Sequence, residues 1–222
     1  MGSGKSELGL ALGGAIVSAG DIRLNGESVA LGKPSCAIAA GIGFVPDDRK
    51  ASALLLVRSV RESFALAWLD RLTRHFRLDT RREAREVGSA MTRYRVSAAS
   101  PEVRISTLSG GNQQKVILGR IFARKPAVLV LSEPTRGIDV GAKSEIYRLL
   151  QDAAEAGAGI IAISSELPEL LGIADRIAVF FEGRLKDIFD ASAISEEDLA
   201  QVAVAGDLPL THPQPISTGA PA

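Results

Sequence analysis

Residues 108–115, with the sequence Leu-Ser-Gly-Gly-Asn-Gln-Gln-Lys, constrain the fold of this chain more than any other segment. Gly110 and Gly111 allow the backbone to approach another group closely, and Ser109 supplies a hydroxyl at the start of the helix that follows. The free N–H groups and positive dipole end of that helix face the same spot, so the segment predicts half of a phosphate-binding site. A serine N-cap after an ordinary glycine turn is the alternative interpretation.

The charge balance argues against nucleic acid as a main partner. Lys and Arg number 26 and Asp and Glu number 26, whereas proteins that bind nucleic acid backbones carry an excess of positive charge. The apolar runs at 127–131 and 159–163 are far shorter than the ~20 residues of a membrane-spanning helix. No signal peptide is visible and the single cysteine, Cys36, cannot form an internal disulfide, so we expect a cytosolic setting and a buried Cys36.

Strand-like and helix-like segments alternate along the chain. Strands are expected at 41–45, 128–131 and 160–163, and helices at 7–15, 140–155 and 195–204. This alternation predicts an α/β fold with a mainly parallel sheet. Turn signals at Asn25-Gly26 and at Glu182-Gly183, the latter between strands at 177–181 and 185–189, predict short antiparallel elements.

A helical subdomain is expected at about 58–110, because residues 60–69 and 81–94 carry helical periodicity with many charges. Within it, Trp68 either packs inside the subdomain or contacts a membrane partner. Together these segments form one domain over residues 1–206. Residues 207–222 are rich in Pro, Ser and Thr and predict a disordered tail.

The chain begins inside a second phosphate-binding pattern, the Walker A motif G-x-x-x-x-G-K-[ST] without its first glycine. Gly2, Ser3 and Gly4 would wrap N–H groups around phosphates, Lys5 would reach the β- and γ-phosphates, and the Ser6 hydroxyl would bind Mg²⁺. An unrelated Gly-Ser turn is the alternative. In P-loop folds a buried strand precedes this loop, so we expect the chain to be truncated at its N-terminus.

A Walker B segment is expected at 131–135, directly after the strand at 128–131. Glu133 would orient or deprotonate the attacking water, although a solvated loop carboxylate is the alternative interpretation. Ser132 stands where a carboxylate normally helps to hold Mg²⁺, and a neutral hydroxyl is a poorer ligand for this cation. Metal binding at this chain's own site should therefore be weak. Further on, Asp139 precedes a helix and could serve as a plain N-cap.

In this order, the motifs resemble the C-terminal ATP-binding half of the duplicated ATPase subunit of bacterial monosaccharide ABC importers, of the ribose, xylose or galactose type. The same family's pattern is matched by Gly-Ile-Gly-Phe-Val-Pro-Asp-Asp-Arg-Lys at 41–50 and by Ser-Ser-Glu-Leu-Pro-Glu at 164–169. The similarity extends from Met1 to about Gly206. It implies a P-loop NTPase domain of the ABC type with an inserted helical subdomain.

The resemblance further implies a head-to-tail sandwich, in which Walker A of one domain and the signature of the other enclose ATP. Contacts to the ATP of a second ATP-binding domain would come from Ser109, Gly110, Gly111, Asn112 and Gln113. Asp139 would act at the seam between the domains. Asp47 stands near ATP where many ABC ATPases have glutamine, and Ser165 stands at the switch position where they have a γ-phosphate-contacting histidine. The local site would therefore be weak or inactive.

The implied function is ATP binding and hydrolysis coupled to sugar import, with ATP and Mg²⁺ as cofactors. Partners would be transmembrane permease subunits, reached through the region after Asp47 and the helices to Tyr94, and indirectly a periplasmic sugar-binding protein. The chain would lie peripherally on the cytoplasmic face of the inner membrane. A nucleoside-type importer ATPase, a non-transport ABC ATPase of DNA repair or translation, and a degenerate fragment without ATPase activity are the alternatives; the fragment would be poorly soluble or oligomeric.

Overall fold

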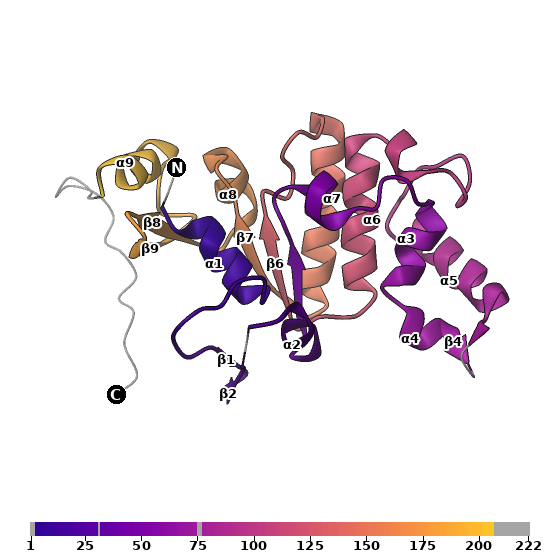
Figure 1. The fold of residues 1–222 in the computed structure, drawn as a ribbon. Coiled ribbons are helices and arrows are strands. Elements are labelled where there is room, and N and C mark those ends of the chain that lie inside the picture. Colours follow the sequence, from indigo (N-terminus) through magenta and orange to yellow (C-terminus); the bar gives the residue numbers. More distant parts are fainter. Residues whose placement is uncertain (1–2, 31, 75–76, 207–222) are drawn as a thin grey trace.

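A parallel sheet of three strands forms the centre of the computed structural model, which describes residues 3–30, 32–74 and 77–206. Its strands are β3 (Ile42–Val45), β6 (Val128–Ser132) and β7 (Gly159–Ile163), with β6 in the middle (Figure 1). β6 pairs in parallel with both neighbours, and four of its five residues are buried. The mainly parallel sheet predicted from the sequence is confirmed.

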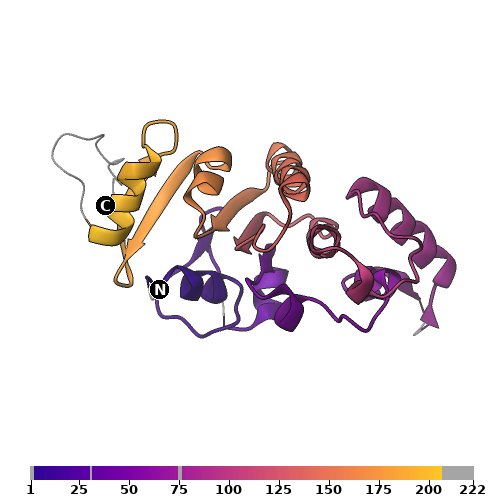
Figure 2. The same cartoon turned by 90° about the horizontal axis from the view of Figure 1, so that it is seen from above.

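Helices cover both faces of this sheet (Figures 1 and 2). On one face lie α1 (Lys5–Leu12) and α2 (Pro34–Ala39), and on the other α6 (Gly110–Phe122) and α7 (Val140–Glu155). Alternation along the strand places Val130 in the core cluster under α1 and α2, whereas Leu129 and Leu131 lie in the cluster with α6 and α7. An unbroken apolar strand is therefore required at β6, because both of its faces are covered.

A helical lobe lies beyond α6, formed by α3 (Val60–Leu66), α4 (Leu69–Leu72) and α5 (Thr80–Arg93). The predicted single helix at 60–69 is interrupted at Trp68, which is 3% exposed and packs 5.3 Å from the Phe64 ring. Trp68 is thus a core residue of the lobe. The short antiparallel pair β4 (Thr73–Arg74) and β5 (Arg77–Leu78) was not predicted.

The lobe shares one apolar core with the sheet. Val60, Phe64 and Val87 of the lobe belong to the same cluster of buried residues as Leu129 and Leu131 of β6. Two short helices connect the lobe to the rest of the domain. The π-helix η1 (Arg49–Ala53) lies between β3 and the lobe, and the 3₁₀-helix η2 (Ile105–Thr107) lies between the lobe and the signature. The signature is consequently anchored to the lobe and to the sheet.

Two antiparallel hairpins confirm the predicted turns. β1 (Arg23–Leu24) and β2 (Glu27–Ser28) are joined by Asn25 and Gly26 with φ of 54° and 86°. β8 (Arg176–Phe181) and β9 (Arg184–Asp190) are joined by Glu182 and Gly183 with φ of 48° and 77°. Positive φ at both central residues matches a type I′ turn, whose twist suits antiparallel strands.

The β8–β9 pair forms a separate sheet with its own small core. α8 (Leu167–Ile173) and α9 (Glu196–Ala205) pack beside it, and Ser195 caps α9 by accepting a hydrogen bond from Asp198 N. Within the described part of the chain, the edge of β7 that faces away from β6 pairs with no strand. Ile161 of β7 is accordingly 38% exposed.

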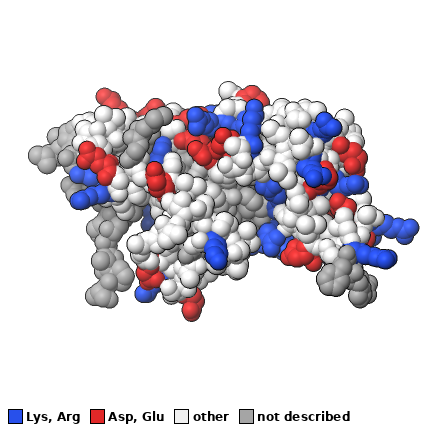
Figure 3. All heavy atoms as spheres, viewed as in Figure 1, with Lys and Arg blue, Asp and Glu red and all other residues white. Residues whose placement is uncertain are grey.

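Acidic and basic side chains are intermixed over the surface seen in Figure 3, in keeping with the net charge of zero. Cys36, expected to be buried, is exposed on the short helix α2. The predicted tail at 207–222 lies outside the described residues, as does Gly2 of the Walker A pattern.

Candidate functional site

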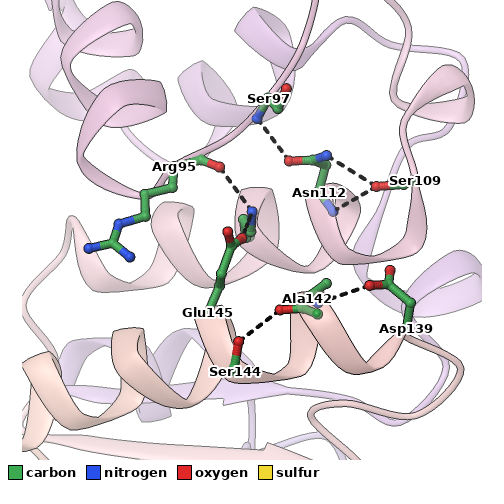
Figure 4. Close-up of polar contacts among 10 residues, drawn as sticks. Arg95, Ser97, Ser109, Asn112, Asp139, Ala142, Ser144 and Glu145 are labelled. Carbon is green, nitrogen blue, oxygen red and sulfur yellow. Dashed lines mark hydrogen bonds and ion pairs between the residues drawn. The ribbon is translucent and has the colours of Figure 1, made fainter.

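The signature segment forms a helix N-terminus whose serine accepts two hydrogen bonds from one asparagine (Figure 4). Ser109 is the N-cap of α6, and its Oγ accepts hydrogen bonds from Asn112 N at 3.4 Å and Asn112 Nδ2 at 3.1 Å. Asn112 is itself fixed, because its Oδ1 accepts a hydrogen bond from Ser97 N at 2.8 Å. A hydroxyl has two acceptor lone pairs and one proton, so these contacts leave the Ser109 proton available for donation.

The two signature glycines pack against α7 and the turn that precedes it. A Cβ on Gly111 would lie 2.5 Å from Ala142 Cβ, and a Cβ on Gly110 would lie 3.2 Å from the Gly137 carbonyl oxygen. The sequence explained these glycines by close approach to an anion. The structure adds a second reason, which is the close approach of α6 to α7.

Asp139 lies next to the signature, at the N-terminus of α7 (Figure 4). Its Oδ1 accepts a hydrogen bond from Ala142 N at 2.9 Å, so the side chain serves as an N-cap. The residue remains exposed, which leaves its second carboxylate oxygen accessible. The structure thus places Ser109 and Asp139 at neighbouring helix N-termini, whereas Gly111 is buried between α6 and α7.

Two further signature residues point inward. Gln113 is 5% exposed, and its Nε2 donates to Ile105 O and Leu108 O, both at 3.2 Å. The sequence grouped Gln113 with the ATP contacts, whereas its side chain here holds the segment in front of the helix. Lys115 is 6% exposed, pairs with Glu145 of α7 and donates a hydrogen bond to Arg95 O just after α5.

The partial Walker A segment lies at the start of α1, at a separate place on the sheet. Gly4 has a φ of 88°, and the Ser3 carbonyl accepts a hydrogen bond from Gly183 N of the β8–β9 turn at 3.2 Å. Lys5 Nζ donates to Ser164 O at 3.3 Å and lies 3.8 Å from Glu133 Oε1. The Ser6 side chain is exposed on the first turn of the helix. Lys5 therefore engages protein groups at this site.

Glu133 follows β6 in a backbone conformation that side chains rarely adopt, with a φ of 49°. Its N–H donates to Ile163 O at 2.7 Å, and its Oε1 accepts a hydrogen bond from Ser165 Oγ at 2.8 Å. Strained backbone of this kind concentrates at functional sites. Lys5 and Ser165 both lie next to the Glu133 carboxylate, so the structure brings together three residues from three separate sequence segments. Asp47 lies exposed on the loop after β3, where its Oδ1 accepts a hydrogen bond from Asp48 N.

Sequence reasoning missed a buried carboxylate behind these residues. Glu169 is 7% exposed and accepts hydrogen bonds from Thr135 Oγ1 at 2.7 Å and Ser164 Oγ at 2.5 Å. The two hydroxyls belong to the loops that carry Glu133 and Ser165, so Glu169 ties these loops together. The Ser-Ser-Glu-Leu-Pro-Glu element was noticed in the sequence, but alternating polar residues do not reveal which ones point inward.

The donor set beside Lys5 fits Mg²⁺ poorly. Ser132 is 5% exposed at the end of β6, and it supplies a neutral hydroxyl where Mg²⁺ favours carboxylate oxygens. The exposed Ser6 hydroxyl is a second neutral donor. Among the residues that the structure describes, no group of three or more His, Cys, Asp or Glu side chains could hold a metal ion.

A family model described as "ABC transporter" matches residues 1–136, which is more than half of the chain. The chain belongs to the ABC transporter family. This assignment confirms the resemblance inferred from the motifs. The fold class, a P-loop NTPase domain of the ABC type, is confirmed by the solved structures below.

Curated relatives of this ABC chain include sugar import proteins. The ribose import ATP-binding protein RbsA of Chromobacterium violaceum is 44% identical over 207 residues, which cover 93% of this chain and 41% of the relative. The xylose import ATP-binding protein XylG of Burkholderia ambifaria is 42% identical over 224 residues, covering 100% of this chain and 43% of the relative. The chain thus spans about two fifths of the length of these relatives.

Solved ABC structures share the fold at lower identity. CbiO1 of Clostridium perfringens, part of the ABC transporter complex cbiONQ, superposes with a TM-score of 0.68 at 24% identity, covering 91% of this chain and 77% of that one. The ATP-binding cassette MJ0796, bound to ADP and Pi, has a TM-score of 0.69 at 18% identity and covers 85% and 81%.

Proposed function

We propose that this chain is an ATP-binding component of an ABC importer for simple sugars, and that it mainly donates its signature segment to a composite ATP site. Walker A of that site would belong to a second ATP-binding domain. The observation that carries the proposal is the Ser109 hydroxyl, whose acceptor positions are filled by Asn112 at the N-terminus of α6. The relatives named as ribose and xylose import proteins support sugar as the cargo.

The signature would act on the γ-phosphate of ATP held by the second domain. The Ser109 proton would be donated to a phosphate oxygen, and the N–H groups and positive dipole end of α6 would stabilise its negative charge. Asp139, beside Ser109 at the start of α7, would contact the second domain at the seam. ATP binding would close the two domains, and hydrolysis would reopen them and drive alternating access in the membrane subunits.

The chain's own nucleotide site would contribute less. Gly2, Ser3, Gly4 and Lys5 would hold phosphates, Ser6 and Asp47 would lie beside them, and Glu133 with Ser165 would face the attacking water. Bound Mg²⁺ would neutralise phosphate charge. With Ser132 in place of a carboxylate, we expect weak Mg²⁺ binding and slow hydrolysis at this site.

Partners and location follow from the same proposal. Permease subunits would meet the region after Asp47 and the lobe that ends at Tyr94, and a periplasmic sugar-binding protein would act indirectly. No helix in the described ranges is long and apolar enough to cross a membrane. The chain would act at the cytoplasmic face of the inner membrane, without nucleic acid as a partner.

The test is ATP turnover by this chain mixed with a second ATP-binding domain that carries a complete Walker A motif. We expect Ser109→Ala to lower the partner-dependent rate roughly 100-fold, because the loss of one donor to a developing charge costs about that much. Ser195→Ala is the matched control, because it removes an N-cap serine from α9.

Equal losses in the two serine variants would mean that helix capping, and not ligand contact, explains the effect of Ser109. No stimulation of the wild-type mixture would overturn the proposal and favour a degenerate fragment, for which Ser132 is the supporting observation. Stimulation by nucleoside permeases but not by sugar permeases would indicate the nucleoside-type importer.

A further inference from the structure

Arg49 reaches from η1 to the turn before α7, far away in the sequence. Its NH1 donates to Arg136 O at 2.7 Å and its NH2 donates to Gly137 O at 3.2 Å. The base of the side chain is fixed as well, because Asp48 caps η1 by accepting hydrogen bonds from Lys50 N and Ala51 N. A planar guanidinium that spans two successive carbonyls holds their orientation as well as their distance.

The same guanidinium packs on the signature. A Cβ on Gly110 would lie 2.9 Å from Arg49 NH2 and 3.6 Å from its Cζ, and a Cβ on Gly137 would lie 3.7 Å from NH2. Arg49 thus lies between Gly110, the first signature glycine, and the turn that leads to Asp139. Glycine at position 110 leaves room for this contact.

The positive charge of Arg49 has no carboxylate within 4.0 Å in the part of the chain that the structure describes. Its Nε is buried without a hydrogen-bond partner. An exposed ion pair would satisfy the charge of Arg49 more easily than two backbone carbonyls do. The contacts of this guanidinium therefore serve to orient the backbone at residues 136 and 137.

We propose that Arg49 is a positioning residue of the signature half-site. It fixes the Arg136–Gly137 backbone against Gly110, so that Ser109 and Asp139 face a second domain at one set spacing. Because Arg49 starts η1 only two residues after Asp47, a displacement of the loop after β3 would reach the half-site through this side chain. The inference rests on the function proposed above for the signature.

Hydrogen exchange of the whole chain tests the positioning without requiring any activity. In Arg49→Lys the charge remains but the two-carbonyl fork is lost, so we expect amides of residues 136–143 to exchange roughly tenfold faster. Arg82→Lys is the matched control, because Arg82 makes an exposed ion pair with Glu86 on α5. Gly110→Ala provides a second variant, in which the new methyl pushes the guanidinium aside and should speed exchange in the same segment.

With the second ATP-binding domain present, Arg49→Lys should lower kcat roughly tenfold and leave KM for ATP within about twofold. A rise in KM with unchanged kcat would overturn the proposal, because it would make Arg49 a direct phosphate contact. Unchanged exchange at 136–143 in both variants would also overturn it. Failure of the wild-type mixture to turn over ATP would instead refute the proposed function, while the exchange result would still decide the role of Arg49.

Discussion

The half-site around Ser109 and the site around Lys5 differ in how their polar groups are satisfied. At the signature, Asn112, itself held by Ser97 N, donates both hydrogen bonds that Ser109 Oγ accepts, and the Ser109 proton is left available. At the second site, Lys5, Glu133 and Ser165 are engaged with one another and with a backbone carbonyl. A ligand at the signature would displace no hydrogen bond of Ser109, whereas a ligand at the second site would have to break the contacts of Lys5, Glu133 and Ser165. This difference in preorganisation is why we propose the signature, and not the site around Lys5, as the main contributor to ATP binding.

The largest effect is expected from Gly111→Ala, which should separate α6 from α7. The new Cβ would lie 2.5 Å from Ala142 Cβ. Overpacking costs up to about 3 kcal/mol, and the helical preference for Ala returns only ~1 kcal/mol, so we expect a net loss near 2 kcal/mol by urea unfolding. Gly88→Ala on α5 is the control, because its Cβ would meet nothing within 4 Å. If Gly111→Ala proved as stable as Gly88→Ala, the tight signature packing would be refuted.

Ser132→Asp should strengthen Mg²⁺-dependent ATP binding at the site around Lys5 and so bring it closer to the signature half-site in function. A carboxylate at the end of β6 adds a charged oxygen ligand, and we expect Mg²⁺-dependent ATP affinity to rise on the order of tenfold by calorimetry. Ser132→Asn, similar in size but neutral, should leave the affinity unchanged. An equal gain in the two variants would show that shape, and not charge, limits this site.

Lys5→Ala should have the smallest effect on partner-dependent turnover, within about twofold. The reason is that the proposed reaction uses Walker A of the second domain, and the Lys5 side chain, 35% exposed, contributes little to stability. Steady-state ATPase assays of the mixture measure this directly. If Lys5→Ala lowered the turnover rate as much as Ser109→Ala does, the site around Lys5, and not the signature, would be the main ATP site of this chain.

The arrangement of strands and turns was predictable because it depends on local pattern. Continuous apolar runs gave β6 and β7, and the Asn25-Gly26 pair gave the first hairpin. The break at Trp68 was not predictable, because residues 60–69 keep helical periodicity and the indole N–H of Trp68 donates to Arg120 O on α6, which only the folded chain brings near. Likewise, the inward direction of Gln113 depends on carbonyls that only the folded chain brings near.

The candidate sites were predictable only as far as their motifs extend. Ser109, Glu133 and Lys5 stand inside patterns whose chemistry is readable from residue type and spacing. Arg49 and Glu169 act through partners that are 87 and 34 residues away, so no local pattern reveals them. Long-range hydrogen bonds of this kind are the part of a site that a single sequence hides.

In residues 3–30, 32–74 and 77–206, no strand pairs with the outer edge of β7, and this affects how the chain would behave at high concentration. Its sequence, Gly-Ile-Ile-Ala-Ile, carries no charge and no proline, the usual devices that keep one strand edge from templating another. Unpaired amides beside the partly exposed Ile161 form such a template. If this edge stays unpaired, copies of the chain would pair through it in competition with productive assembly, and more so as the chain becomes more concentrated.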